Sequence, residues 1–271
     1  MFSFEHILWI IISFVFVALI IFFYGRKKPS FEKVLNCAII GCIASEILKL
    51  ISYIKLVPSA GGEMATPYLP LSQLPLHMCS LQIVLIIYVR YAKNKDRRDY
   101  VLAFMYPTTI VGAISAMILP RIFRTDVTPD KAFLTPVTYQ FFFYHVLLIA
   151  LGVIIVRSGE INWQKRHLKA ALIIFFVMSF ASFYLNSVFA VPTYVDGKLV
   201  SVDFSTNFFY SYQNPLGITF TAIWQWYLYV MGMYILAVSI IVLFIYPLIF
   251  AQAKRVTVLP GKKVKQCKTN G

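Results

Sequence analysis

Seven apolar runs divide the chain, and each is close to the length that an α-helix needs to cross a bilayer. That length is about 20 residues, because a helix rises about 1.5 Å per residue and the hydrocarbon core is about 30 Å thick. Little sequence remains for a soluble domain, so residues 1–256 are predicted to form one membrane domain, followed by a basic tail at 257–271. The predicted spans are 7–24, 34–57, 74–91, 100–119, 137–156, 170–191 and 226–250.

The longest connection, residues 192–217, carries a turn signal. Asp196 and Gly197 stand between β-forming residues, which is the pattern of a two-residue type I′ turn in a β-hairpin. The predicted fold class is therefore all-α: a polytopic membrane helical bundle of seven transmembrane helices, with a small outer β-hairpin in the sixth loop.

Composition supports lipid as the solvent. Hydrophobic residues make up 59% of the chain and charged residues 13%, about half the charged share of about 25% in soluble proteins. The net charge of +14 does not require nucleic acid, because Lys and Arg accumulate in the cytoplasmic loops of membrane proteins. No nucleic-acid partner is expected.

Lys and Arg are distributed unevenly between the two ends of the predicted spans. The connections after spans one, three and five, together with the C-terminal segment, hold 19 of them, and the other connections hold 5. The positive-inside rule then predicts an outer N-terminus and a cytoplasmic C-terminus. Arg26, Lys27 and Lys28 follow the first apolar run instead of preceding it, which predicts an uncleaved first span.

The spacing of the cysteines and the motifs that do not occur exclude several kinds of binding site. Cys37, Cys42, Cys79 and Cys267 form no CxxC pair, and the first three lie in or beside apolar runs, so no disulfide framework is expected. No Gly-rich phosphate loop, nucleotide motif or metal-ligand spacing occurs, and no cofactor or metal is expected.

Polar and ionisable side chains within the spans gather in the predicted outer half. Cys79 lies about 7 Å and His145 about 12 Å below the outer ends of their spans, at 1.5 Å per residue. Ionisable groups inside a span are costly, and they mark functional sites by default. The other members of this group are His77, Asn186, Glu46 and Lys49. By contrast, His6 and His167 are predicted to be loop residues without partners.

A thiol near two imidazoles is the arrangement of nucleophilic acyl chemistry, because histidine takes the proton from cysteine and the thiolate attacks an ester carbonyl. Each residue also has a structural interpretation. Cys79 is a small packing residue, His145 packs among the aromatic residues 141–144, and Glu46 and Lys49 neutralise each other at i,i+3 spacing.

Two stretches carry a family resemblance. Residues 74–81, Leu-Pro-Leu-His-Met-Cys-Ser-Leu, resemble the LPLHxC signature of the YwaF family of bacterial integral membrane proteins. Residues 206–210, Thr-Asn-Phe-Phe-Tyr, with Asn214-Pro215, resemble that family's TNYxYL…KP segment before the last span. Phe208 stands where the family favours Tyr, and Asn214 where it favours Lys. The resemblance covers essentially the whole chain.

The YwaF family is similar to the eukaryotic transmembrane-protein-164 acyltransferases, which move polyunsaturated acyl chains between phospholipids through a cysteine acyl-enzyme and a histidine. The resemblance implies that His77 is the motif histidine and His145 the later-span histidine. The eukaryotic cysteine stands beside the histidine, where this chain has Leu76, so Cys79 is either a displaced nucleophile or a packing residue. A more distant similarity to androgen-induced serine-hydrolase-like membrane proteins, which pair Thr with His, makes Thr206 or Ser80 an alternative nucleophile.

Together with the resemblance, this gives the leading hypothesis: a multi-pass acyltransferase or hydrolase of a bacterial plasma membrane, which acts on membrane phospholipids near the outer leaflet. Cys79 is the predicted nucleophile, His145 the base, and His77 orients or shares that role. The predicted substrate-binding residues are Asn207, Asn186, Glu46 and Thr206.

Two other function classes remain open. Glu46 and Lys49, with Pro107 in the fourth span, also fit the substrate path of a transporter or small-molecule binding protein. A seven-helix sensor with an outer ligand cavity is the third candidate.

Overall fold

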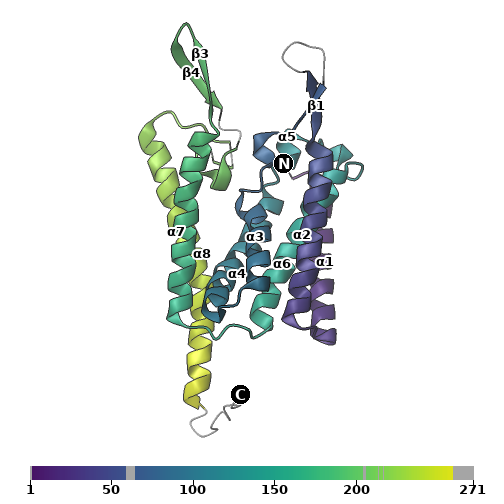
Figure 1. The fold of residues 1–271 in the computed structure, drawn as a ribbon, viewed down its shortest axis with the longest axis vertical. Helices are drawn as coiled ribbons and strands as arrows, with labels where there is room; N and C mark the ends of the chain where they lie inside the picture. The colour runs from purple at the N-terminus through teal and green to yellow at the C-terminus, as the bar shows by residue number, and fades with distance from the viewer. Residues whose placement is uncertain (1, 59–64, 204–205, 213, 216, 259–271) are drawn as a thin grey trace.

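The structure, a computed structural model, describes residues 2–58, 65–203, 206–212, 214–215 and 217–258. Among these residues, six helices are long and apolar enough to cross a membrane (Figure 1). The predicted polytopic helical bundle is confirmed, and the chain is a multi-pass membrane protein. The six helices are α1 (Phe4–Lys27), α2 (Phe31–Tyr53), α4 (Lys95–Ile118), α6 (Pro136–Arg157), α7 (Lys165–Val188) and α8 (Ile223–Val258).

The third predicted span, 74–91, differs from the expectation. Its helix α3 is Met78–Tyr91, 14 residues long, and a short 3₁₀ turn, η1 (Leu71–Gln73), precedes it. At 1.5 Å per residue α3 is about 21 Å long, less than the roughly 30 Å of hydrocarbon. Pro75 explains the late start, because the residue before a proline avoids the helical region and Leu74 is extended at ψ 141°. His77 is left as the extended N-cap residue of α3.

Helix α8 exceeds the predicted span 226–250 at both ends. Its 36 residues correspond to about 54 Å at 1.5 Å per residue, and its lower end extends past the other helices in Figure 1. The predicted basic tail at 257–271 lies, from residue 259 onward, outside the described residues. The remaining short elements are α5 (Ile122–Thr125), η2 (Pro129–Lys131) and η3 (Phe208–Tyr210).

The predicted β-hairpin is confirmed. Strand β3 (Val191–Val195) pairs antiparallel with β4 (Lys198–Asp203). Asp196 and Gly197 between them both have positive φ, 48° and 72°, as a type I′ turn requires.

A second hairpin was not predicted. Strand β1 (Lys55–Pro58) pairs with β2 (Ala65–Tyr68), and β1 includes residues that the sequence analysis assigned to the second span. Both hairpins and the start of α1 lie at the upper end of the bundle in Figure 1, and the end of α8 lies at the lower end. The upper end is called the hairpin end below, and the lower end the basic end, since most Lys and Arg of the loops lie there.

Helix α4 is the centre of the bundle. It packs against α3, α6, α7 and α8, while α6 also covers α1 and α2. The largest fully buried side chains of the core include Phe104 on α4 and Phe142 on α6. Helix α3, which carries Cys79, packs against α4 and α2.

Replacing Gly152 by alanine is expected to destabilise the bundle by about 2 kcal/mol, because overfilling a packed core forces its neighbours apart. A Cβ at Gly152 would lie 2.5 Å from both Ile110 Cγ1 and Thr109 Oγ1 on α4. The measurement is the thermal unfolding midpoint in detergent. Gly232→Ala is the matched control, since a Cβ there meets nothing within 4 Å. Equal midpoints for the two variants would contradict this description of the α4–α6 contact.

Candidate functional site

The two stretches that carry the family resemblance meet in space, although more than a hundred residues separate them in the chain. The His77 ring makes an edge contact with Phe208, with 5.1 Å between ring centroids, and lies 6.5 Å from the Tyr210 ring. Phe208 is fully buried in η3. The histidine of the first motif thus packs on the short helix formed by the second.

Asn186, near the end of α7, holds η3 in place. Its Oδ1 accepts hydrogen bonds from the backbone N–H of Phe208 at 2.7 Å and from Thr206 Oγ1 at 3.2 Å. Its Nδ2 donates to the carbonyl of Phe208 at 3.0 Å. Asn186 and Thr206 are fully buried. These bonds order the segment against which His77 packs.

Asn207 contributes to the same segment. It adopts the left-handed conformation, with φ 30° and ψ 47°, and its Oδ1 accepts from the backbone N–H of Tyr212 at 3.1 Å. Three of the four predicted substrate-binding residues, Asn186, Thr206 and Asn207, therefore lie together beside His77. Their role in binding a substrate stays a prediction.

Cys79 is the second residue of α3 and lies at the junction of three helices. Its backbone carbonyl accepts a hydrogen bond from Tyr144 Oη on α6 at 2.7 Å. Its Sγ would lie 3.7 Å from a Cβ placed on Gly112 of α4, so the thiol faces the close approach of α3 to α4. This hydrogen bond brings the start of α3 to the side chain that precedes His145 on α6. Ser80 follows on α3 and is half-buried.

The His145 imidazole is buried and oriented by its own helix. Its Nδ1 lies 2.6 Å from the carbonyl oxygen of Phe141. A carbonyl only accepts, so Nδ1 carries the proton and a neutral ring keeps its lone pair on Nε2. The predicted packing among aromatic residues is also present, because the Phe141 ring centroid lies 4.4 Å from that of His145. The arrangement fixes which nitrogen is available as a base.

The thiol–imidazole contact itself is not formed in this state. Within the described part of the chain, Cys79 Sγ has no hydrogen bond to His77 or to His145. Catalytic hydrogen bonds are commonly long or misaligned without substrate and tighten in the complex. Proton transfer therefore requires a movement of the thiol relative to the helix that carries His145.

Glu46 and Lys49 form the structural pair that their spacing predicts. Lys49 Nζ lies 2.7 Å and 2.8 Å from the two Glu46 carboxylate oxygens. The exposed fraction of the Lys49 side chain is 10%, and that of Glu46 is 23%. The next polar contact along α2 joins Ser45 to Gln140 of α6 at 2.7 Å.

A cavity of about 110 Å³ lies beside the first motif, between α7, α8 and η3. Met78, which stands between His77 and Cys79, forms part of its wall. The wall combines apolar side chains with hydroxyl groups, and Ser182 and Ser211 are hydrogen-bonded to each other across it at 2.7 Å. Its chemistry suits a hydrocarbon chain that ends near a polar group.

Two histidines were wrongly predicted to be partnerless loop residues. His6 lies in α1, fully buried, and its Nε2 donates to the carbonyl of Met117 at 2.8 Å. His167 lies in the first turn of α7, where its Nδ1 accepts from the backbone N–H of Gln164 at 2.9 Å. The Ser3 N-cap three residues before His6 was the available sequence signal for an earlier helix start.

Comparison with known proteins identifies the family. The family model described as the TMEM164 family matches residues 1–246. No curated protein and no solved structure matches the chain. Because the family model covers most of the sequence, the chain belongs to the TMEM164 family.

Proposed function

We propose that this TMEM164-family member is an integral membrane enzyme that transfers or hydrolyses phospholipid acyl chains. Cys79 is the nucleophile, and His145 is the general base. The observation that carries the proposal is the His145 geometry: its imidazole has the Nδ1 proton on the Phe141 carbonyl and its lone pair on Nε2, and its chain neighbour Tyr144 is hydrogen-bonded to the Cys79 carbonyl. Family membership and the motif resemblance support the same chemistry.

In the first half-reaction, Cys79 Sγ attacks the carbonyl carbon of a phospholipid ester, and its proton passes to His145 Nε2. The tetrahedral intermediate collapses, the ester C–O bond breaks, and His145 returns the proton to the lysophospholipid hydroxyl. In the second half-reaction, the hydroxyl of an acceptor lipid or of water gives its proton to His145 and attacks the thioester. The C–S bond then breaks, and the Cys79 thiol regains the proton.

His77, Asn186, Asn207 and Thr206 form the wall on the other side of the α3 N-terminus. In the proposal this wall positions the substrate ester, because Asn186 and Asn207 hold η3 in place and His77 packs on it. The cavity beside Met78 receives part of the acyl chain, which arrives laterally from the lipid phase. With the N-terminus outside, this site faces the outer leaflet of the plasma membrane.

Turnover in proteoliposomes tests the proposal. The purified protein is reconstituted with a phospholipid labelled in one acyl chain and an unlabelled lysophospholipid, and transferred chain and free fatty acid are measured. We expect Cys79→Ala to reduce turnover at least about 1,000-fold, because loss of a nucleophile removes the covalent route. Cys42→Ala, at a buried cysteine of α2, is the control and keeps its activity.

Variants of the two alternative nucleophiles, Thr206 and Ser80, test whether Cys79 is assigned correctly. Ser80→Ala is expected to retain turnover, and Thr206→Val is expected to reduce it far less than Cys79→Ala does, because Thr206 positions the substrate and is not the nucleophile. If Cys79→Ala is fully active and Thr206→Val is inactive, the nucleophile assignment is wrong. If the wild-type protein transfers and releases no chain from any phospholipid class, the enzymatic proposal is wrong.

A further inference from the structure

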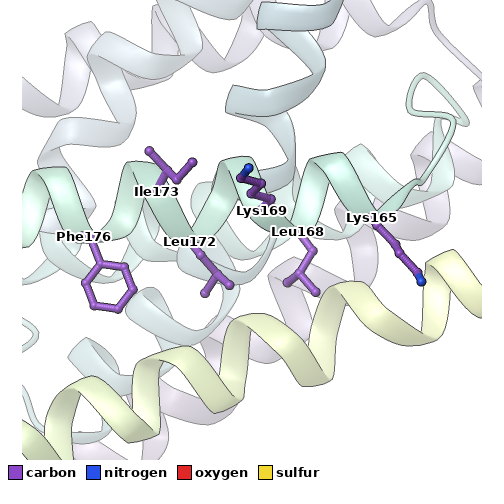
Figure 2. Close-up of a pocket in the computed structure, with 6 residues that line it drawn as sticks. All are labelled: Lys165, Leu168, Lys169, Leu172, Ile173 and Phe176. Atoms are coloured by element: carbon purple, nitrogen blue, oxygen red, sulfur yellow. The ribbon is translucent and has the colours of Figure 1, made fainter.

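A groove of about 370 Å³ runs along the first half of α7, at the basic end of the bundle (Figure 2). Apolar side chains alternate along it with two lysines one helical turn apart. Figure 2 shows Lys165, Leu168, Leu172 and Phe176 on the side of α7 that faces α8. The lining residues are Lys165, Leu168, Lys169, Leu172, Ile173 and Phe176.

The length of this groove matches one leaflet. Lys165 and Phe176 are eleven positions apart, which is about 16 Å along a helix. Half of the hydrocarbon core is about 15 Å. With its lysines at the headgroup level, the groove reaches the middle of the bilayer at Phe176.

The two lysines carry uncompensated positive charge. Their neighbours are paired: Arg166 lies 3.1 Å from Asp96, and Arg98 lies 3.0 Å from Glu160. For Lys165 and Lys169, no carboxylate among the residues that the structure describes lies within 4.0 Å. A ligand that lies on them gains charge complementarity without displacing an existing ion pair.

Contacts between α7 and α8 bound the groove at both ends. At the basic end, the backbone N–H of Trp163 donates to Gln252 Oε1 of α8 at 2.7 Å. At the other end, the Phe176 ring stacks on Tyr234 of α8, with centroids 5.7 Å apart and an interplanar angle of 8°. These contacts fix the position of α7 beside α8, and the open groove on α7 has a defined length between them.

We propose that this groove binds one anionic phospholipid, with its phosphate on Lys165 and Lys169 and an acyl chain along Leu168 and Leu172 to Phe176. Lysines at the membrane surface attract anionic headgroups, and the aliphatic parts of their side chains lie along apolar surface. The site is at the opposite end of the bundle from Cys79. It is independent of the proposed acyl chemistry.

Native mass spectrometry of the purified full chain in detergent tests the site, with phosphatidylglycerol and phosphatidylcholine as probes. We expect one phosphatidylglycerol to be retained in preference to phosphatidylcholine, and Lys165→Gln/Lys169→Gln to weaken that binding about 10-fold. Lys33→Gln, an exposed lysine of α2 at the same end, is the matched control and has no effect. Cys79→Ala is expected to bind phosphatidylglycerol in this groove as the wild type does. The lipid-binding proposal can therefore be wrong while the enzymatic proposal holds, and the reverse.

A second variant separates a shaped groove from diffuse attraction. Leu172→Trp fills the groove and keeps both lysines, and it is expected to reduce retention as strongly as the double charge variant. Val177→Trp, at a 63% exposed position of the same helix, leaves retention unchanged. Inorganic phosphate in excess does not displace the lipid, because the chain contributes to binding. The proposal is overturned if both phospholipids bind equally, if Leu172→Trp has no effect, or if phosphate competes fully.

Discussion

Replacing His145 by alanine is expected to slow acylation of Cys79 by at least about 100-fold while the protein remains folded. A positioned general base typically contributes about 10² to 10⁴ to the rate. The Phe141 carbonyl holds the Nδ1 proton, and this leaves the Nε2 lone pair as the base. The measurement is the initial rate of Cys79 labelling by a thiol-reactive acyl probe in lipid.

His167→Ala is the control for this variant. That histidine is also buried and also hydrogen-bonded to backbone through Nδ1, but it lies at the basic end in the first turn of α7. Equal labelling rates for wild type, His145→Ala and His167→Ala would show that His145 is a packing residue.

Glu46→Leu is expected to destabilise the bundle by about 3 kcal/mol, because it leaves the Lys49 charge buried without its partner. The double variant Glu46→Leu/Lys49→Leu removes both charges and is expected to recover most of that loss. The measurement is the thermal unfolding midpoint in detergent for the single and double variants.

The exposed Arg90–Glu32 pair supplies the comparison for this effect. Its atoms are 3.9 Å apart and the Glu32 side chain is 69% exposed, so Glu32→Leu is expected to change stability by less than about 0.5 kcal/mol. A Glu46→Leu variant no less stable than Glu32→Leu would contradict the structural role assigned to the buried pair. It would direct attention to the transporter hypothesis, in which Glu46 contacts a substrate.

The apolar runs predicted the helices well, because every backbone group in lipid must be paired within the chain and a helix achieves this locally. The predicted helix bounds were wrong where a proline, a strand pairing or a capping residue changes the backbone at the end of an apolar run. Pro75 delays α3 until Met78, and the residues from Lys55 pair as a strand although they continue the hydropathy of α2. Ser3 and its capping bond place His6 inside α1.

The sequence predicted a common depth for the candidate site residues, but it did not predict their contacts. Counting residues from the span ends placed Cys79, His77 and His145 in the same half of the membrane. It did not indicate that His77 packs on Phe208, since that contact depends on how helices far apart in sequence are arranged around α4. The bonds that anchor Phe208 to Asn186 are equally non-local, and no spacing rule reveals them.

The central claim is that Cys79 becomes acylated, and peptide mapping after reaction with a lipid-like acyl probe tests it most directly. Cys37, which is exposed on α2, serves as the internal reference for unassisted thiol reactivity. The account predicts a hydroxylamine-sensitive thioester on the Cys79 peptide that forms faster than any adduct on Cys37. Label on Cys37 with none on Cys79 would contradict it.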